Sequence, residues 1–197
     1  MSAAASTSAR PTVPEATPTR AIRLIRVAVL LVAGMAIAFS PQMHEQLGFD
    51  RGITAAALGA LGIAHLIEWG SLSSSNRTPV ALLLGIAAVA SALALPFTTS
   101  VLAFAIIVAA WALASALLEF IGAAVRPGSR QDATLVGAFG VLLSLFVLMS
   151  REDQVAVLGF FGAYLLLAGV FLGISAFDIR RGTSEVNESA EIAPSAS

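Results

Sequence analysis

The stretch from 98 to 125 constrains this chain most, because its 28 residues carry a single charge, Glu119. At about 1.5 Å per residue, a helix of this length exceeds the roughly 30 Å hydrocarbon core of a bilayer. We therefore expect a membrane-spanning helix that is tilted or reaches the headgroups. A carboxylate at the centre of a span costs about 2.5–3.5 kcal/mol on insertion scales. Small residues lie at helical spacings on the same side of this helix as Glu119, so we expect this side to face protein. They are Ala112, Ser115, Ala116, Gly122 and Ala123.

The composition of the whole chain agrees with a membrane protein. Of its 197 residues, 57% are hydrophobic and 12% are charged, whereas soluble domains carry about 25% charged residues. The net charge of −1 and the lack of a basic patch argue against a nucleic-acid partner. The absence of cysteine excludes disulfides, thiolate metal sites and a cysteine nucleophile. The lipid bilayer is the expected partner, and a homo-oligomer or another membrane protein is left open.

Prolines and polar connections divide the apolar sequence into six expected helices, at about 22–40, 53–70, 79–95, 98–125, 133–149 and 154–177. The polar ends, 1–19 and 182–197, are expected to be disordered cytoplasmic tails, the second of them acidic. Residues 20–181 then form an all-α integral membrane domain with six transmembrane helices, arranged as three tandem hairpins. A cleaved signal peptide is the alternative for the first helix, because residues 36–38 resemble a cleavage site. The long leader and the matching helices downstream favour a retained span.

Arginines predict how this domain is oriented. Six spans place both termini on one side, and two arginines, Arg51 and Arg151, fall on the other. The termini side holds nine: Arg10, Arg20, Arg23, Arg26, Arg77, Arg126, Arg130, Arg180 and Arg181. The positive-inside rule therefore places both termini in the cytoplasm.

A weak repeat relates the three pairs of helices, at a period of roughly 51–55 residues. The second helix of each pair carries a similar segment, at 59–64, 109–114 and 162–167. A two-helix repeat returns to its starting side, so successive copies have the same orientation. This favours three hairpins around an axis along the membrane normal over the inverted repeats of many transporters. The alternative is that composition alone makes the helices of a small bundle alike.

Three polar residues in apolar surroundings form a candidate intramembrane cluster: His65, Glu68 and Glu119. His65 and Glu68 share a helix face, and the two carboxylates are expected at similar depth. Intramembrane carboxylates often mark ion or proton pathways, and a carboxylate near a histidine can relay protons. In the structural alternative, Glu68 reaches the interface beside Trp69. Glu119 then only fixes helix packing, paired with His65 or with an arginine: Arg77, Arg126 or Arg130.

Other chemistry finds little support in the sequence. His65 with Glu68, and His44 with Glu45, supply too few ligands for a zinc site. The sequence has neither a phosphate-binding loop, nor a dinucleotide fingerprint after a strand, nor a nucleophile elbow. We therefore expect no catalytic residue, no cofactor, no metal and no enzymatic activity. Three glycine pairs have spacings typical of close helix contacts: Gly137 with Gly140, Gly159 with Gly162, and Gly169 with Gly173.

Three segments resemble one family, at 110–113 (Ala-Trp-Ala-Leu), 119–122 (Glu-Phe-Ile-Gly) and 135–142 (Leu-Val-Gly-Ala-Phe-Gly-Val-Leu). They are similar to HdeD-like bacterial membrane proteins, which have six helices in tandem two-helix repeats. The resemblance covers about residues 22–180 and implies a bacterial inner-membrane protein linked to acid resistance. It carries no catalytic residues. One branch of this family is sometimes labelled acyl-CoA synthetase, but this chain lacks the phosphate loop and the soluble mass of such enzymes.

These observations lead to three hypotheses about function. The first is an HdeD-like protein that contributes to acid or envelope stress tolerance. The second is a small proton- or ion-linked permease that uses His65, Glu68 and Glu119. The third is a scaffold subunit that packs against a larger membrane complex through its small-residue faces.

Overall fold

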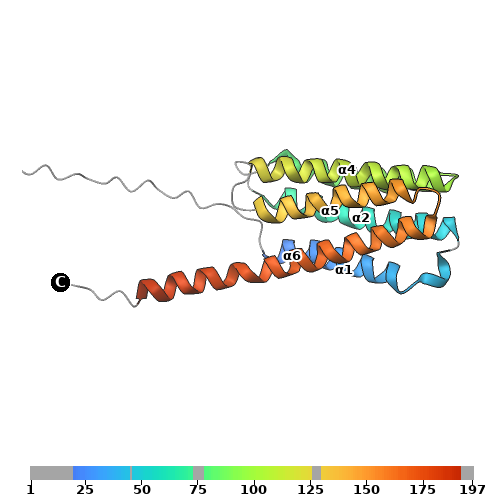
Figure 1. The fold of residues 1–197 in the computed structure, drawn as a ribbon. Coiled ribbons are helices and arrows are strands. Elements are labelled where there is room, and N and C mark those ends of the chain that lie inside the picture. Colours follow the sequence, from blue (N-terminus) through green and yellow to red (C-terminus); the bar gives the residue numbers. More distant parts are fainter. Residues whose placement is uncertain (1–19, 45, 73–77, 126–129, 192–197) are drawn as a thin grey trace, which may run out of the picture.

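The computed structural model describes residues 20–44, 46–72, 78–125 and 130–191, and all regular structure in these ranges is helical. The elements are α1 (Arg20–Ala38), η1 (Pro41–Met43), α2 (Leu47–Ser71), α3 (Pro79–Ala94), η3 (Leu95–Phe97), α4 (Val101–Val125), α5 (Arg130–Met149) and α6 (Gln154–Glu191). The six long helices lie side by side in one bundle (Figure 1). Each is long and apolar enough to cross a membrane. The predicted all-α integral membrane fold with six transmembrane helices is confirmed.

The second helix begins earlier than the sequence suggests. The expected start was near residue 53, whereas α2 begins at Leu47, so Asp50 and Arg51 belong to the helix and not to the preceding loop. Gly48 and Gly52 weaken this first part of the helix without breaking it. A carboxylate in the first turn, here Asp50, also stabilises a helix N-terminus. This shift determines where the polar side chains at this end of the bundle lie.

The last helix ends later than expected. It continues to Glu191, past the predicted end at 177 and into the tail that was expected to be disordered from 182. No proline interrupts the sequence between Gln154 and Pro194, so nothing forces the helix to stop at the end of its apolar part. Figure 1 shows α6 projecting beyond the bundle at the end where α1 begins. Residues 1–19 and 192–197, predicted as disordered, lie outside the described residues.

The helices form a closed ring in chain order, because each packs against the next and α6 packs against α1. The pairs α2–α3, α4–α5 and α6–α1 share large interfaces of similar extent. The sequential hairpins α1–α2, α3–α4 and α5–α6 share smaller ones, again similar to each other. The same alternation therefore occurs three times around the ring. Composition alone would not impose this order, so it favours three tandem hairpins around a common axis, here called the bundle axis.

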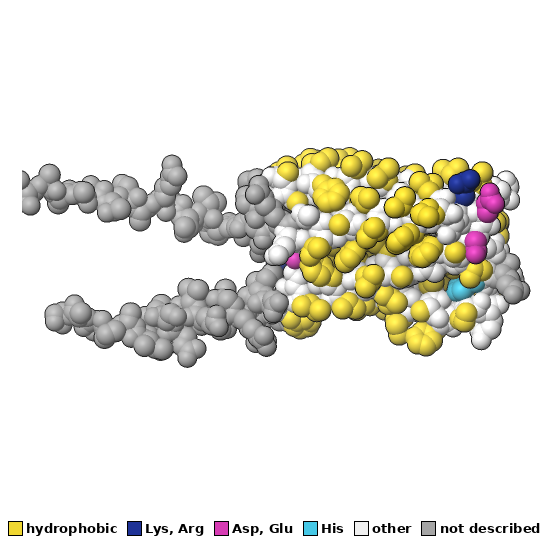
Figure 2. Space-filling view, in the orientation of Figure 1, with side chains coloured by type: hydrophobic (Ala, Val, Ile, Leu, Met, Phe, Trp, Pro, Cys, Tyr) yellow, Lys and Arg dark blue, Asp and Glu magenta, His cyan; other side chains and the backbone are white. Residues whose placement is uncertain are grey.

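The even-numbered helices lie nearest the bundle axis. The buried share of their apolar segments is 39% for α2 and 44% for both α4 and α6, against 22%, 28% and 33% for α1, α3 and α5. The outer wall is largely apolar, and Figure 2 shows charged side chains only towards the ends of the visible face. Such a wall is suited to contact with lipid chains.

Glycines allow close backbone contact in all three large interfaces. A Cβ on Gly62 of α2 would lie 3.0 Å from the carbonyl oxygen of Gly85 on α3. A Cβ on Gly140 of α5 would lie 3.1 Å from the Ala112 oxygen on α4, and one on Gly34 of α1 would lie 3.1 Å from the Leu166 nitrogen on α6. Helices that approach this closely gain dispersion contacts, which drive association in lipid.

The predicted packing glycines divide into two groups. Gly137, Gly140, Gly162 and Gly169 face a neighbouring helix closely, whereas a Cβ on Gly173 would make only an ordinary contact, 3.4 Å from Val27. The prediction is wrong for Gly159, because no described residue would lie within 4 Å of its Cβ. Its spacing to Gly162 fits a contact stripe, but its own side of α6 meets no neighbour.

Substituting alanine for Gly62 is expected to destabilise the bundle by about 1–3 kcal/mol, since the new Cβ would meet backbone atoms of α3. The matched control is Gly59→Ala, one turn earlier on α2, where the Cβ would find only an ordinary contact at 3.9 Å. The control should be neutral, or more stable by up to about 1 kcal/mol. Unfolding in detergent micelles measures both. Equal effects of the two variants would contradict the proposed close contact.

Candidate functional site

A small cavity lies inside the bundle, with a volume of about 10 Å³, the space of about one water molecule. All six helices contribute to its wall. Leu61, Trp111 and Tyr164 occupy matching positions in the three repeated segments, and all three line the cavity. One turn further along the same helices, His65, Ser115 and Ala168 also line it. The cavity therefore lies on the bundle axis, where the three hairpins meet.

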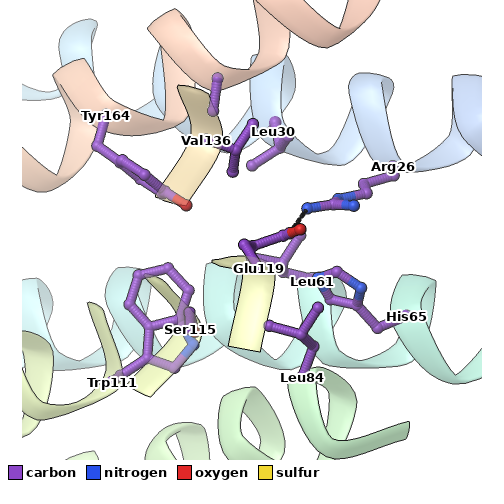
Figure 3. A pocket seen from close by; sticks show the side chains of 11 residues that line it. Arg26, Leu30, Leu61, His65, Leu84, Trp111, Ser115, Glu119, Val136 and Tyr164 are labelled. Atoms are coloured by element: carbon purple, nitrogen blue, oxygen red, sulfur yellow. Dashed lines mark hydrogen bonds and ion pairs between the residues drawn. The ribbon is translucent and has the colours of Figure 1, made fainter. Parts of the chain in front are cut away.

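The strongest polar contact in the cavity wall joins Arg26 to Glu119. The Arg26 Nη2 atom donates a hydrogen bond to Glu119 Oε1 at 2.6 Å, and the two side chains are 18% and 11% exposed. Arg26 belongs to α1 and Glu119 to α4, which lie opposite each other in the ring. The ion pair thus crosses the bundle axis (Figure 3). It offsets the cost of placing either charge among apolar helices.

This partner of Glu119 differs from those that the sequence suggested, namely Arg77, Arg126, Arg130 or His65. The sequence indicated Arg26 only as one of the arginines that flank the first helix. It lies six residues into α1, about 9 Å from its start, and its long side chain reaches the centre. Arg77, Arg126 and the side chain of Arg130 lie outside the described residues.

His65 and Glu68 lie beside this ion pair. His65 is 3% exposed and lines the cavity. Its Nδ1 atom has no hydrogen-bond partner among the described residues and lies 4.0 Å from Glu68 Oε2, within ion-pair range but too far for a hydrogen bond. The Glu68 side chain is only 14% exposed and interacts electrostatically with Arg26, although it does not line the cavity. The structure therefore brings all three members of the predicted cluster around one arginine.

We call these four side chains the central cluster: Arg26, His65, Glu68 and Glu119. It holds two carboxylates and one guanidinium, so with a neutral imidazole it carries one negative charge more than positive. Arg23, one turn before Arg26 on α1, forms no ion pair with either carboxylate of the cluster. One proton, on a carboxylate or on the imidazole, would balance the charges. A group with this imbalance in an apolar interior is a natural binding site for a proton.

Aromatic residues that the sequence analysis did not single out as functional complete the wall. Trp111 packs edge-to-face against Phe161 and Tyr164, with ring centroids 5.7 and 5.9 Å apart, and joins α4 to α6. Its indole N–H is buried and has no hydrogen-bond partner in the described part of the chain. The matching repeat positions of Leu61, Trp111 and Tyr164 were the signal that could have indicated this shared wall.

Among the described residues, no three His, Asp or Glu side chains come close enough together to hold a metal ion. Comparisons with protein-family models, with curated proteins and with solved structures give no match for this chain. The function therefore has to be inferred from the geometry and chemistry of the site.

Removing either charge of the central ion pair is expected to destabilise the bundle by about 3 kcal/mol, because the other charge is left buried and unpaired. The double variant Arg26→Met with Glu119→Gln should lose clearly less than the sum of the two single losses. A double-mutant cycle, measured by unfolding in detergent, tests this coupling.

The matched control replaces Arg26→Met by Arg23→Met, which removes an arginine one turn away that is not paired with Glu119. Arg23→Met and Glu119→Gln should then give additive losses. Additive losses for Arg26 and Glu119 themselves would show that the pair contributes no coupling energy.

Proposed function

We propose that this chain is an HdeD-like inner-membrane protein of a bacterium, without enzymatic activity, which carries protons across the membrane by binding and releasing them at its central cluster. In this role it contributes to tolerance of acid or envelope stress. Both termini lie in the cytoplasm. The proposal joins the first two hypotheses from the sequence, since a proton-linked membrane protein is one way of responding to acid.

The observation that carries the proposal is the charge imbalance of the central cluster. Glu119 and Glu68 both interact with the single guanidinium of Arg26, and His65 lies within 4.0 Å of Glu68. A purely structural ion pair would need only one carboxylate. The second carboxylate and the unpartnered imidazole nitrogen are the features that a proton site requires.

The size of the cavity supports a proton over a larger ion or solute. About 10 Å³ admits one water molecule at most, and large side chains such as Trp111 and Tyr164 close it. A hydrated metal ion or an organic substrate would need a far larger opening. A proton can pass along hydrogen-bonding groups without such an opening.

The proposed orientation rests on the arginines. Eight of the eleven precede or begin the first span, follow the last or flank the connections on the termini side, and the ninth, Arg26, lies in the half of α1 nearer that side. Figure 1 agrees that α1 begins and α6 leaves the bundle at the same end. The positive-inside rule places this end in the cytoplasm.

A scaffold subunit is the alternative, and the length of α6 favours it. This helix runs to Glu191, well beyond its apolar part, and projects from the bundle where a partner could pack against it (Figure 1). Copurification of one partner at fixed stoichiometry, lost on truncation after Phe177, would support this alternative.

Proton flux tests the proposal directly. Proteoliposomes that contain the full chain and a pH-sensitive dye should acidify faster than empty liposomes when a proton gradient is applied. Glu119→Gln should reduce the flux to the level of empty liposomes, because it removes the carboxylate that lines the cavity. Folded, monodisperse protein must be verified for the variant.

The matched control for this assay is Asp132→Asn. Asp132 lies on α5, outside the central cluster, and accepts a hydrogen bond from Ser175 on α6. Its neutralisation should leave the flux unchanged. Equal flux from wild type, Glu119→Gln and empty liposomes would overturn the proposed proton transport through the central cluster.

Acid survival separates the two joined hypotheses. Cells that lack the gene should survive acid better when they are complemented with the wild type than with a variant that neutralises both Glu68 and Glu119. If both proteins complement equally, the protein supports stress tolerance without using its carboxylates.

A further inference from the structure

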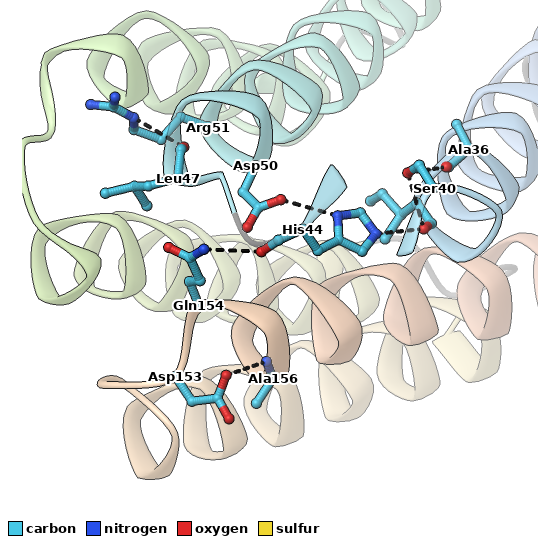
Figure 4. A network of polar contacts seen from close by, with 10 residues as sticks. Ala36, Ser40, His44, Leu47, Asp50, Arg51, Asp153, Gln154 and Ala156 are labelled. Carbon is cyan, nitrogen blue, oxygen red and sulfur yellow. Dashed lines mark hydrogen bonds and ion pairs between the residues drawn. The ribbon is translucent and has the colours of Figure 1, made fainter. Parts of the chain in front are cut away.

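A second polar group lies where α1 ends and α2 begins (Figure 4), at the end of the bundle away from the start of α1 (Figure 1). His44, in the connection between α1 and α2, has its Nδ1 atom 3.0 Å from Asp50 Oδ1 and its Nε2 atom 2.9 Å from the Ile37 carbonyl oxygen. His44 is 7% exposed and Asp50 is fully buried. The sequence predicts the second helix only from about residue 53, which leaves both residues in the connection before it.

The hydrogen bonds of His44 determine how many protons His44 and Asp50 hold together. A carbonyl oxygen can only accept a hydrogen bond, so the contact with Ile37 requires a proton on Nε2. The contact between Nδ1 and Asp50 Oδ1 then needs one proton between them. Either an imidazolium donates to a carboxylate, or a carboxylic acid donates to a neutral imidazole. In both forms the pair shares one proton and has no net charge.

We propose that His44 and Asp50 form a proton-binding site that holds three helix ends together, and that uptake of a second proton opens it. Through Ile37 the site holds the end of α1, and through Asp50 the start of α2. Gln154, at the start of α6, donates from Nε2 to the His44 carbonyl oxygen at 2.9 Å. The site is therefore a proton-dependent latch at the end of the bundle opposite the termini.

In the pair of His44 and Asp50, one oxygen atom is available to bind the second proton. Asp50 Oδ2 is buried and has no hydrogen-bond partner in the part of the chain that the structure describes, and neither has the Thr54 hydroxyl, one turn later on α2. Protonation at Oδ2 leaves the imidazolium of His44 without a negative partner in a buried site, which is costly. In an opened connection, water would solvate the same charge.

The opened form therefore binds the second proton more tightly than the closed form. By linkage, lowering the pH shifts the equilibrium toward the opened form, and the latch is stable only above the pH at which the second proton binds. The opened form is favoured because water solvates the positive charge of His44, which is unpaired in the closed form.

Neighbouring charged groups have other partners. Arg51 on α2 donates from its guanidinium to the carbonyl oxygens of Thr98 and Leu47. Asp153, before α6, accepts a hydrogen bond from the Ala156 backbone N–H at 3.0 Å, and Arg151 donates to the Leu148 carbonyl oxygen. In the described chain, the only ion pair that includes either residue of the latch is the one between them. Glu45 lies outside the described residues.

Nitrogen NMR of the histidines tests the shared proton in the full chain in lipid nanodiscs. The chain has only two histidines, so ¹⁵N-histidine labelling gives few signals, and His65→Gln assigns them. We expect His44 to be protonated at Nε2 and to share the Nδ1 proton with Asp50 at neutral pH. A His44 ring without a proton on Nε2 would overturn the proposal.

Asp50→Asn is the matched variant, since the amide has the size of the carboxyl group and can donate to Nδ1 of a neutral imidazole. In this variant His44 should carry a proton on Nε2 alone, with an Nδ1 shift distinct from the wild type. Identical ¹⁵N signals in both proteins would overturn the shared proton.

Hydrogen exchange tests the opening. Once the second proton binds, the opening equilibrium of wild-type amides in residues 37–50 should rise about tenfold for each unit of falling pH, after correction for intrinsic exchange. In Asp50→Asn the rise should begin at a higher pH, because the closed form of this variant holds a neutral His44 imidazole that can bind a proton once the connection opens. The same pH dependence in both proteins, or none in the wild type, would overturn the latch. Neither result depends on whether the central cluster binds a proton.

Discussion

A charge inside an apolar helix bundle is stable only where an opposite charge meets it, and the pair of Arg26 and Glu119 meets this condition at the bundle axis. The two residues lie 93 positions apart and on opposite helices of the ring. Their contact fixes the depth of α1 relative to α4 and brings His65 and Glu68 close to the same guanidinium. The excess of one carboxylate in this group is the basis of the proposed proton binding.

The repeated architecture explains why such a site forms at the axis. Three hairpins with similar interfaces bring equivalent positions together, so Leu61, Trp111 and Tyr164 face one cavity although they come from different repeats. The repeats supply close packing through glycines, and they differ in the polar residues that they place at the centre. The acidic and basic groups of the central cluster come only from the first two hairpins. The polar residues of the candidate site therefore lie at positions where the sequences of the repeats differ.

The parts of this structure that depend on local sequence could be predicted. Apolar length alone indicates the six spans, and small residues beside Glu119 indicate that this face of α4 meets protein. Partners across the bundle could not be predicted, because they depend on the relative depth and rotation of separate helices. For this reason Arg26 was missed as the partner of Glu119, and Gly159 was wrongly expected at a helix contact. The contact of His44 with Asp50 was missed because the start of α2 was placed too late.

Charge reversal tests the central ion pair most directly. Arg26→Glu and Glu119→Arg each place two like charges together in the bundle interior, so either variant alone should fail to give folded, monodisperse protein. The double reversal restores opposite charges at the same two positions, and it should recover most of the yield and stability. This recovery would show that the two side chains meet across the bundle axis. If the double reversal is no better than the single ones, Arg26 and Glu119 do not form the pair on which this account depends.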